Sequence, residues 1–162
     1  MDAWLKEAVW NQLGAAIDTL ENTVRACPEE LWGDRSREPE YWYLVFHTLF
    51  FLDYYLADSP DGFAPPAPFT LDELDPAGVL PERVYTRDEL LTYLEFGRRK
   101  ARAVIAGMTD EQAGESRLEG SLLEQLLYVM RHVQHHAAQL NLILRRETGS
   151  ATRWVKKAKD DL

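Results

Sequence analysis

Prolines are concentrated in one stretch of this chain and constrain its fold more than any other feature. Six of the eight lie within residues 58–85. Proline lacks a backbone N–H and clashes with the preceding helical turn, so no long helix can cross this stretch. On both sides of it, apolar residues recur at spacings of three and four, which indicates amphipathic helices. With no alternating strand pattern and no internal repeat, the chain is predicted to be all-α.

The periodicity predicts four long helices, at about residues 3–25, 39–57, 87–108 and 122–148. Pro39 suits the first position of the second helix, because its fixed φ is already helical and its missing N–H is not needed there. Short helical turns are expected at residues 28–32 and 109–112. The predicted fold is therefore a four-helix bundle with a long Pro-rich crossover between its second and third helices.

Residues with capping preferences mark the ends of the later helices. Thr86 with Glu89, and Ser121 with Glu124, have the spacing of capping boxes at the starts of the third and fourth helices. Gly149 is placed to end the fourth helix. These signals fix the two helices independently of their apolar pattern.

The second helix is apolar nearly all round, which predicts a position deep in the bundle. Its apolar stretch, residues 41–57, is interrupted by polar side chains and is short for a bilayer span. The connection that follows, residues 58–85, is far longer than most helix connections. We interpret it as a crossover strap packed by Phe63 and Phe69, with a lid over a site as the alternative.

Length and charge narrow the possible functions. A chain of 162 residues suits one domain, which we place at residues 1–149, followed by a polar tail at residues 150–162. The 18 Lys and Arg against 27 Asp and Glu give a net charge of −9. This balance argues against nucleic-acid partners, whose phosphates require clustered positive charge, and against anionic membrane surfaces.

The chain has one cysteine, Cys27, which excludes an intrachain disulfide and a thiolate-rich zinc site. Its first residues lack the basic-then-apolar pattern of a signal peptide. A reducing compartment fits both features, so we expect a cytoplasmic protein. We expect Cys27 itself to be an unreactive residue at a helix end.

All four histidines lie in two predicted helices: His47 in the second, and His132, His135 and His136 in the fourth. On a wheel of about 100° per residue, His136 lies roughly 80° and His132 roughly 120° from the core direction of the fourth helix. Being four residues apart, these two share one face, whereas His135 points towards solvent. His47 lies midway along the buried second helix. His47, His132 and His136 are therefore predicted to converge.

Two histidines at positions i and i+4 of a helix can bind one transition metal. A third imidazole from a facing helix would leave a coordination position open for water or substrate, as in catalytic sites. Imidazole nitrogens suit zinc, nickel, copper or iron, whereas magnesium and calcium prefer oxygen. The alternative is that the histidines are hydrogen-bonded core residues, which is the commoner role for a single histidine. The pair combined with the bundle geometry favours the metal.

Two stretches resemble the DinB/YfiT-like family of metal-binding helical bundles. Residues 42–50, Trp-Tyr-Leu-Val-Phe-His-Thr-Leu-Phe, are similar to its second-helix signature. Residues 131–140 contain its fourth-helix pattern, His-x-x-His-His-x-x-Gln-Leu. The helix order and the spacing between the motifs match over most of the chain. Matched by position, the resemblance implies His47, His132 and His136 as the metal ligands.

The resemblance further implies one divalent metal, with zinc as the first expectation and nickel as the alternative, and a homodimer. Characterised relatives include transferases and isomerases that use low-molecular-weight thiols such as bacillithiol or mycothiol. We therefore expect a small-molecule substrate and a metal-dependent thiol S-transferase. Two alternatives stay open: a hydrolase that uses metal-bound hydroxide, and a non-catalytic metal-binding or stress-related module.

Several polar and aromatic residues lie near the predicted site. Gln125 and Gln139 share the histidine side of the fourth helix, where an amide oxygen could orient an imidazole; a solvated flank is the role we favour. Aromatic residues on the His47 side of the second helix are expected in the core, with walling a substrate pocket as the alternative: Tyr43, Phe50 and Tyr54.

The third helix carries a run of basic residues, Arg98, Arg99, Lys100 and Arg102. They could bind a carboxylate of an acidic thiol cofactor. We favour a solvated helix face instead, because long basic side chains usually keep their charges in water.

Overall fold

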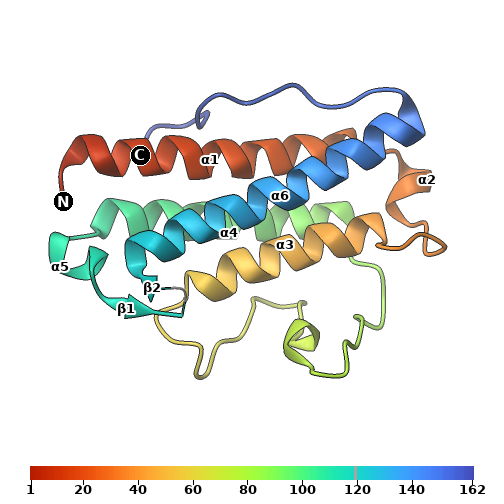
Figure 1. Ribbon diagram of the computed structural model, residues 1–162. Helices are drawn as coiled ribbons and strands as arrows, with labels where there is room; N and C mark the ends of the chain where they lie inside the picture. Colours follow the sequence, from red (N-terminus) through yellow and green to blue (C-terminus); the bar gives the residue numbers. More distant parts are fainter. Residues whose placement is uncertain (119) are drawn as a thin grey trace.

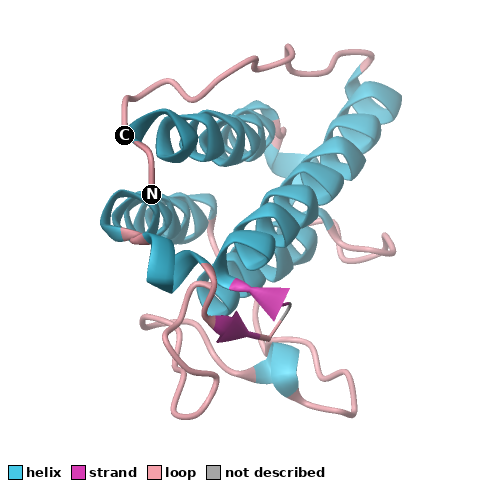
Figure 2. Cartoon of the chain, turned by 60° about the vertical axis from the view of Figure 1, so that its left-hand side comes forward, coloured by secondary structure: helices cyan, strands magenta, loops and turns pink. Residues whose placement is uncertain are grey.

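The computed structural model describes residues 1–118 and 120–162 and confirms that the chain is predominantly helical. Four long helices form the bundle (Figures 1 and 2). In chain order the elements are α1 (Ala3–Ala26), α2 (Glu29–Trp32), α3 (Tyr41–Tyr55), η1 (Asp72–Leu74), α4 (Arg87–Gly107), α5 (Asp110–Ala113), β1 (Ser116–Arg117), β2 (Gly120–Ser121) and α6 (Leu122–Thr148). Helices α1 and α3 each pack against both α4 and α6.

The helix ends follow local capping chemistry. Both predicted capping boxes are confirmed: Thr86 with Glu89 starts α4, and Ser121 with Glu124 starts α6. Gly149 ends α6 in the left-handed region, at φ 73°, where a side chain would be strained. The helix ends therefore match their sequence signals within the usual one or two residues.

The predicted start of α3 was wrong by two residues. We expected Pro39 at the first helical position, but α3 begins at Tyr41. Glu40 is the extended residue before the helix, and its carboxylate accepts a hydrogen bond from the indole of Trp42 over 2.6 Å. Glu40 therefore occupies the N-cap position, and Pro39 lies one residue before it, outside the helix.

Helix α3 forms the centre of the core. Ten of its 15 residues are buried, which explains why its sequence has no polar face. The crossover covers one side of it (Figure 1). Phe69 stacks on Tyr93 of α4, with ring centroids 4.3 Å apart, and Phe63 contacts Phe50 of α3 at 5.5 Å. These contacts support the strap interpretation of residues 58–85.

Two features lie outside the helical pattern. Strands β1 and β2 form a two-residue antiparallel ladder, although no strand was predicted, because two residues are too few to show alternation. The tail runs back along α1, where the Ala158 N–H donates to the Asn11 carbonyl over 2.9 Å. A Cβ on Gly14 would lie 2.5 Å from that of Ala158, so glycine permits this close approach. Among the described residues, no helix is long and apolar enough to cross a membrane.

Candidate metal centre

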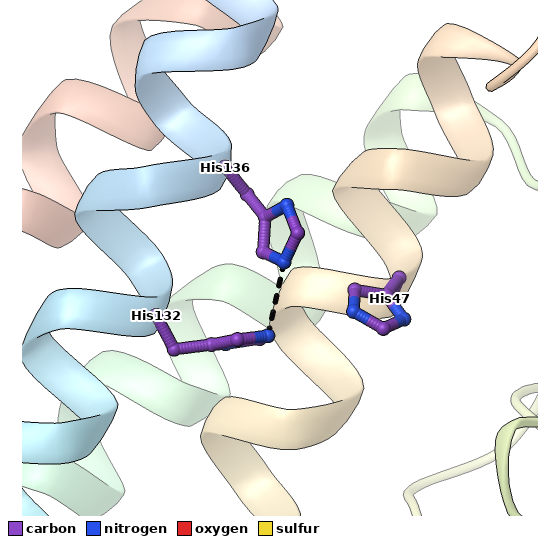
Figure 3. Close-up of side chains that lie close together, drawn as sticks. All are labelled: His47, His132 and His136. Carbon is purple, nitrogen blue, oxygen red and sulfur yellow. Dashed lines mark hydrogen bonds between the residues drawn. The ribbon is translucent and has the colours of Figure 1, made fainter.

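Three imidazoles converge between α3 and α6. His47 comes from α3, and His132 and His136 come from α6; we call these three the histidine cluster. Figure 3 shows them directed towards one another across the contact of the two helices. One nitrogen from each ring lies within 4.8 Å of the other two. The structure thus brings together the three residues that the sequence predicts to converge.

The spacing of the histidines on α6 produces this geometry. Because His132 and His136 are one helical turn apart, their side chains stack on one face. Their Nε2 atoms are 3.1 Å apart. Two nitrogens bound to one tetrahedral zinc, at roughly 2.0–2.1 Å each, are about 3.3 Å apart. The pair therefore already has nearly the separation that a shared metal requires.

Burial favours the neutral, metal-binding form of His132 and His136. Burial, together with the neighbouring imidazoles, lowers the pKa of His132 to about 3. Burial also lowers the pKa of His136, against a smaller opposing effect of its Gln139 hydrogen bond. Among the described residues, the buried Nδ1 of His132 has no hydrogen-bond partner. Neutral imidazoles with lone pairs directed into one space fit a divalent transition metal.

Two of the three rings are oriented by an oxygen acceptor at Nδ1. The Gln139 side-chain oxygen lies 2.7 Å from Nδ1 of His136. Glu73, in η1 of the crossover, places Oε2 2.7 Å from Nδ1 of His47. Such acceptors fix which nitrogen carries the proton and leave the other free for a metal. Gln139 is exposed, as the favoured solvated flank implies, and it also takes the imidazole-partner role considered as the alternative. Glu73 was missed in the sequence analysis.

Aromatic side chains surround His47. The ring of Phe51, one turn further along α3, lies 4.9 Å from the His47 ring and 5.8 Å from that of His132. Its i+4 spacing from His47 is a signal that the sequence analysis missed. Tyr43 lies 6.3 Å from His47 and is half-buried, whereas Phe50 is fully buried in the core. His135 is exposed and outside the cluster, as predicted.

Gln125 does not take part in the histidine cluster. Its side-chain amide donates to the Tyr55 carbonyl, and it is 2% exposed. Neither role considered for it, an imidazole partner or a solvated flank, is therefore correct. Burial of a primary amide requires such a partner, and the end of α3 supplies it.

The basic residues on α4 do not all lie on one exposed face. Arg98 is 4% exposed and pairs with Asp18 and Glu21 of α1. Lys159 of the tail joins them, its Nζ lying 2.8 Å from Glu21 Oε2; we call these four residues the Arg98 cluster. The favoured solvated face was thus wrong for Arg98, because the residue lies on the buried stripe of α4.

Lys100 is likewise engaged within the bundle. Its Nζ lies 2.5 Å from Oδ1 of the buried Asp53.

Cys27 is buried, and burial raises the pKa of its thiol to about 12. A thiol with such a pKa is protonated near neutral pH and unreactive, which agrees with the expectation for this residue.

Comparison with known proteins identifies the family to which the chain belongs. The DinB superfamily model matches residues 12–140, a range that includes α3 and all three histidines of the cluster. No match was found among the curated proteins or among the solved structures. Because the family model covers well over half of the sequence, the chain belongs to the DinB superfamily.

Proposed function

We propose that this protein is a metal-dependent enzyme that transfers a low-molecular-weight thiol to a small electrophilic substrate. The observation that carries the proposal is the histidine cluster, in which three ligand nitrogens lie within 4.8 Å of one another. Three protein ligands leave at least one coordination position for an external ligand, as in catalytic sites. The choice of a thiol rests on the resemblance to thiol-dependent relatives.

Each residue around the centre has a definable task. The three imidazoles would hold the metal, and Gln139 and Glu73 orient two of them through Nδ1. Phe51 packs against two of the rings and gives the centre an apolar wall on that side. A bound divalent metal would lower the pKa of a coordinated thiol, so that a nucleophilic thiolate is available near neutral pH.

Solvent access and space nearby support a small-molecule substrate. The His47 side chain is 26% exposed, so an external ligand can reach the centre. His132 also lines an open cavity of about 660 Å³ between α1, α6 and the tail, a volume within the range of small-molecule pockets. His47 and His136 do not line this cavity, so it adjoins the centre on the α1 side of α6 and does not enclose it.

The proposal is tested with untagged protein stripped by a chelator and reloaded with zinc or nickel. A panel of thiols and electrophiles is offered to the metal-free form, the loaded form and loaded His47→Ala. We expect turnover that requires both metal and thiol and is lost in His47→Ala. Turnover without thiol would instead support the hydrolase alternative. Equal rates in the metal-free and loaded forms would contradict a metal-dependent enzyme.

We also propose a homodimer, on the basis of the family resemblance alone. Light scattering coupled to size-exclusion chromatography would measure the mass directly. A mass twice that of the 18.7 kDa chain would support the dimer, and a mass equal to that of the chain would contradict it.

A further inference from the structure

Glu73 is an acidic residue in an unexpected place. It lies in η1, near the middle of the crossover, 26 positions from His47. Its side chain is 3% exposed, although most residues around it in the crossover are exposed. Carboxylates are rarely buried unless a partner compensates the lost hydration. Two side chains face this carboxylate: His47, whose Nδ1 lies 2.7 Å from Oε2, and Tyr43, whose pKa Glu73 helps burial to raise. The other oxygen, Oε1, is buried without a hydrogen-bond partner among the described residues.

The contact between Glu73 and His47 favours one tautomer of the imidazole. A carboxylate accepts hydrogen bonds, so this contact favours the tautomer of His47 that has its proton on Nδ1. In a neutral imidazole the other nitrogen, Nε2, then holds the lone pair. Figure 3 shows the His47 side chain directed from α3 towards the two rings of α6. The contact with Glu73 therefore prepares His47 to act as a ligand through Nε2.

The histidine cluster has a second contact of this kind, but of different origin. Nδ1 of His136 meets Gln139 three residues further along the same helix. That pair is set by helix geometry alone. The acceptor of His47, in contrast, comes from the crossover and is present only when that segment is in place.

We propose that Glu73 is a positioning residue for His47, and that the crossover thereby controls how tightly the histidine cluster holds its metal. The inference rests on the proposed metal centre and deepens it. Carboxylates behind metal-binding histidines fix the ring and raise its basicity, and their loss typically reduces metal affinity by about 10–100-fold. The strap between α3 and α4 is on this account part of the metal site.

The test measures zinc affinity by competition with a chromophoric chelator for full-length wild type, Glu73→Ala, Glu73→Gln and the control Glu82→Ala. Glu82 is an exposed acidic residue of the same crossover. We expect the dissociation constant of Glu73→Ala to rise by about 10–100-fold. Glu73→Gln should lie between Glu73→Ala and wild type, because its amide oxygen still accepts a hydrogen bond. Glu82→Ala should match wild type.

A second readout separates positioning from direct ligation. Each variant is saturated with Co²⁺ and its visible absorption bands are recorded. We expect the bands of Glu73→Ala to keep the wild-type shape and intensity, because the ligand set is unchanged once the metal is bound. Thermal unfolding of the metal-free forms checks that each variant is folded, and the isosteric Glu73→Gln carries the test if Glu73→Ala does not fold.

Two results would overturn the inference. Wild-type zinc affinity in both Glu73 variants would show that the carboxylate has no role at the centre. Altered Co²⁺ bands at saturation would make Glu73 a ligand and not a positioning residue. Failure of the wild type itself to bind metal would contradict the proposed metal centre, and this outcome is distinguished from the other two by the wild-type measurement alone.

Discussion

The Arg98 cluster and the histidine cluster are both groups of polar side chains at helix contacts of one bundle, yet they differ in how their charges are matched. In the Arg98 cluster two cations meet two carboxylates. In the histidine cluster three groups of the same kind point their nitrogens into one space. In the Arg98 cluster the positive and negative side chains neutralise one another. The nitrogen lone pairs of the histidine cluster have no such partner within the cluster, and a bound cation would supply one. We therefore assign a structural role to the first cluster and ligand binding to the second.

The surroundings of each cluster agree with this difference. Burial alone would raise the pKa of Glu21, but hydrogen bonds from Lys159 and Arg25 and the charge of Arg98 outweigh it and lower that pKa. The Arg98 cluster thus stabilises its own charged forms and ties α1, α4 and the tail together. For His132, burial and the neighbouring imidazoles both disfavour the charged form. The histidine cluster therefore contains no pair of opposite charges that would stabilise a protonated imidazole.

The largest expected effect breaks the Arg98 cluster. Arg98→Ala should destabilise the protein by about 3–5 kcal/mol, because it leaves a buried carboxylate without its guanidinium partner. The control is Arg99→Ala, an exposed neighbour, which should change stability by less than about 0.5 kcal/mol. Urea unfolding followed by circular dichroism measures both. Equal stability of the two variants would contradict the structural role of Arg98.

The next largest effect is the stabilisation of the folded protein when zinc binds to the histidine cluster. Zinc at a free concentration 100 times the dissociation constant should stabilise the wild type by about 2.7 kcal/mol, because it binds the folded state selectively. His132→Leu should show no such gain, since one ligand is missing. Unfolding in zinc buffers and in chelator measures the difference. A zinc effect of equal size in both proteins would show that the metal acts elsewhere.

A smaller effect is expected from pH in the metal-free protein. The pKa of His132 is lowered from 6.5 to about 3 in the folded state, so between these values the unfolded chain binds a proton that the folded chain does not. Stability should therefore fall as the pH decreases from 7 towards 5. In His132→Leu the fall should be shallower. Melting temperatures of both proteins, measured between pH 5 and 7, test this expectation. An identical dependence of melting temperature on pH in the two proteins would contradict the assigned burial of His132.

The smallest effect is expected from removing Gln139, the hydrogen-bond partner of His136. Gln139→Ala should weaken zinc binding by less than about tenfold, and by less than Glu73→Ala does. Gln139 is exposed, so water can replace its oxygen at His136, whereas the Glu73 side chain is only 3% exposed. The chelator competition described above provides the measurement. A greater loss in Gln139→Ala than in Glu73→Ala would reverse the proposed ranking of the two contacts.

Sequence periodicity predicted those parts of the molecule that depend on short-range geometry. The four long helices and two capping boxes follow from spacings of three and four residues. The convergence of His132 and His136 follows from the same rule. The burial of Arg98 was also encoded, because the residue falls between Leu94 and Ala101 on the apolar stripe of α4, but its basic neighbours concealed the signal.

The remaining features depend on long-range packing that no local pattern records. Glu73 reaches His47 through an irregular segment, where backbone direction has no fixed period. Gln125 is buried because the end of α3 happens to present a carbonyl to it. Likewise, the tail contacts α1 across more than 140 positions of sequence. Such contacts require the assembled bundle before they can be identified.

The most direct test of the account is the metal content of untagged protein. Wild type, His47→Ala and His136→Ala are purified alongside His135→Ala, a control in which an exposed histidine next to the cluster is removed. Elemental analysis after reconstitution with zinc or nickel should find near-stoichiometric metal in wild type and His135→Ala, and loss of it in the other two. Absence of metal from the wild type, or its retention in His47→Ala and His136→Ala, would contradict a metal centre built from the histidine cluster.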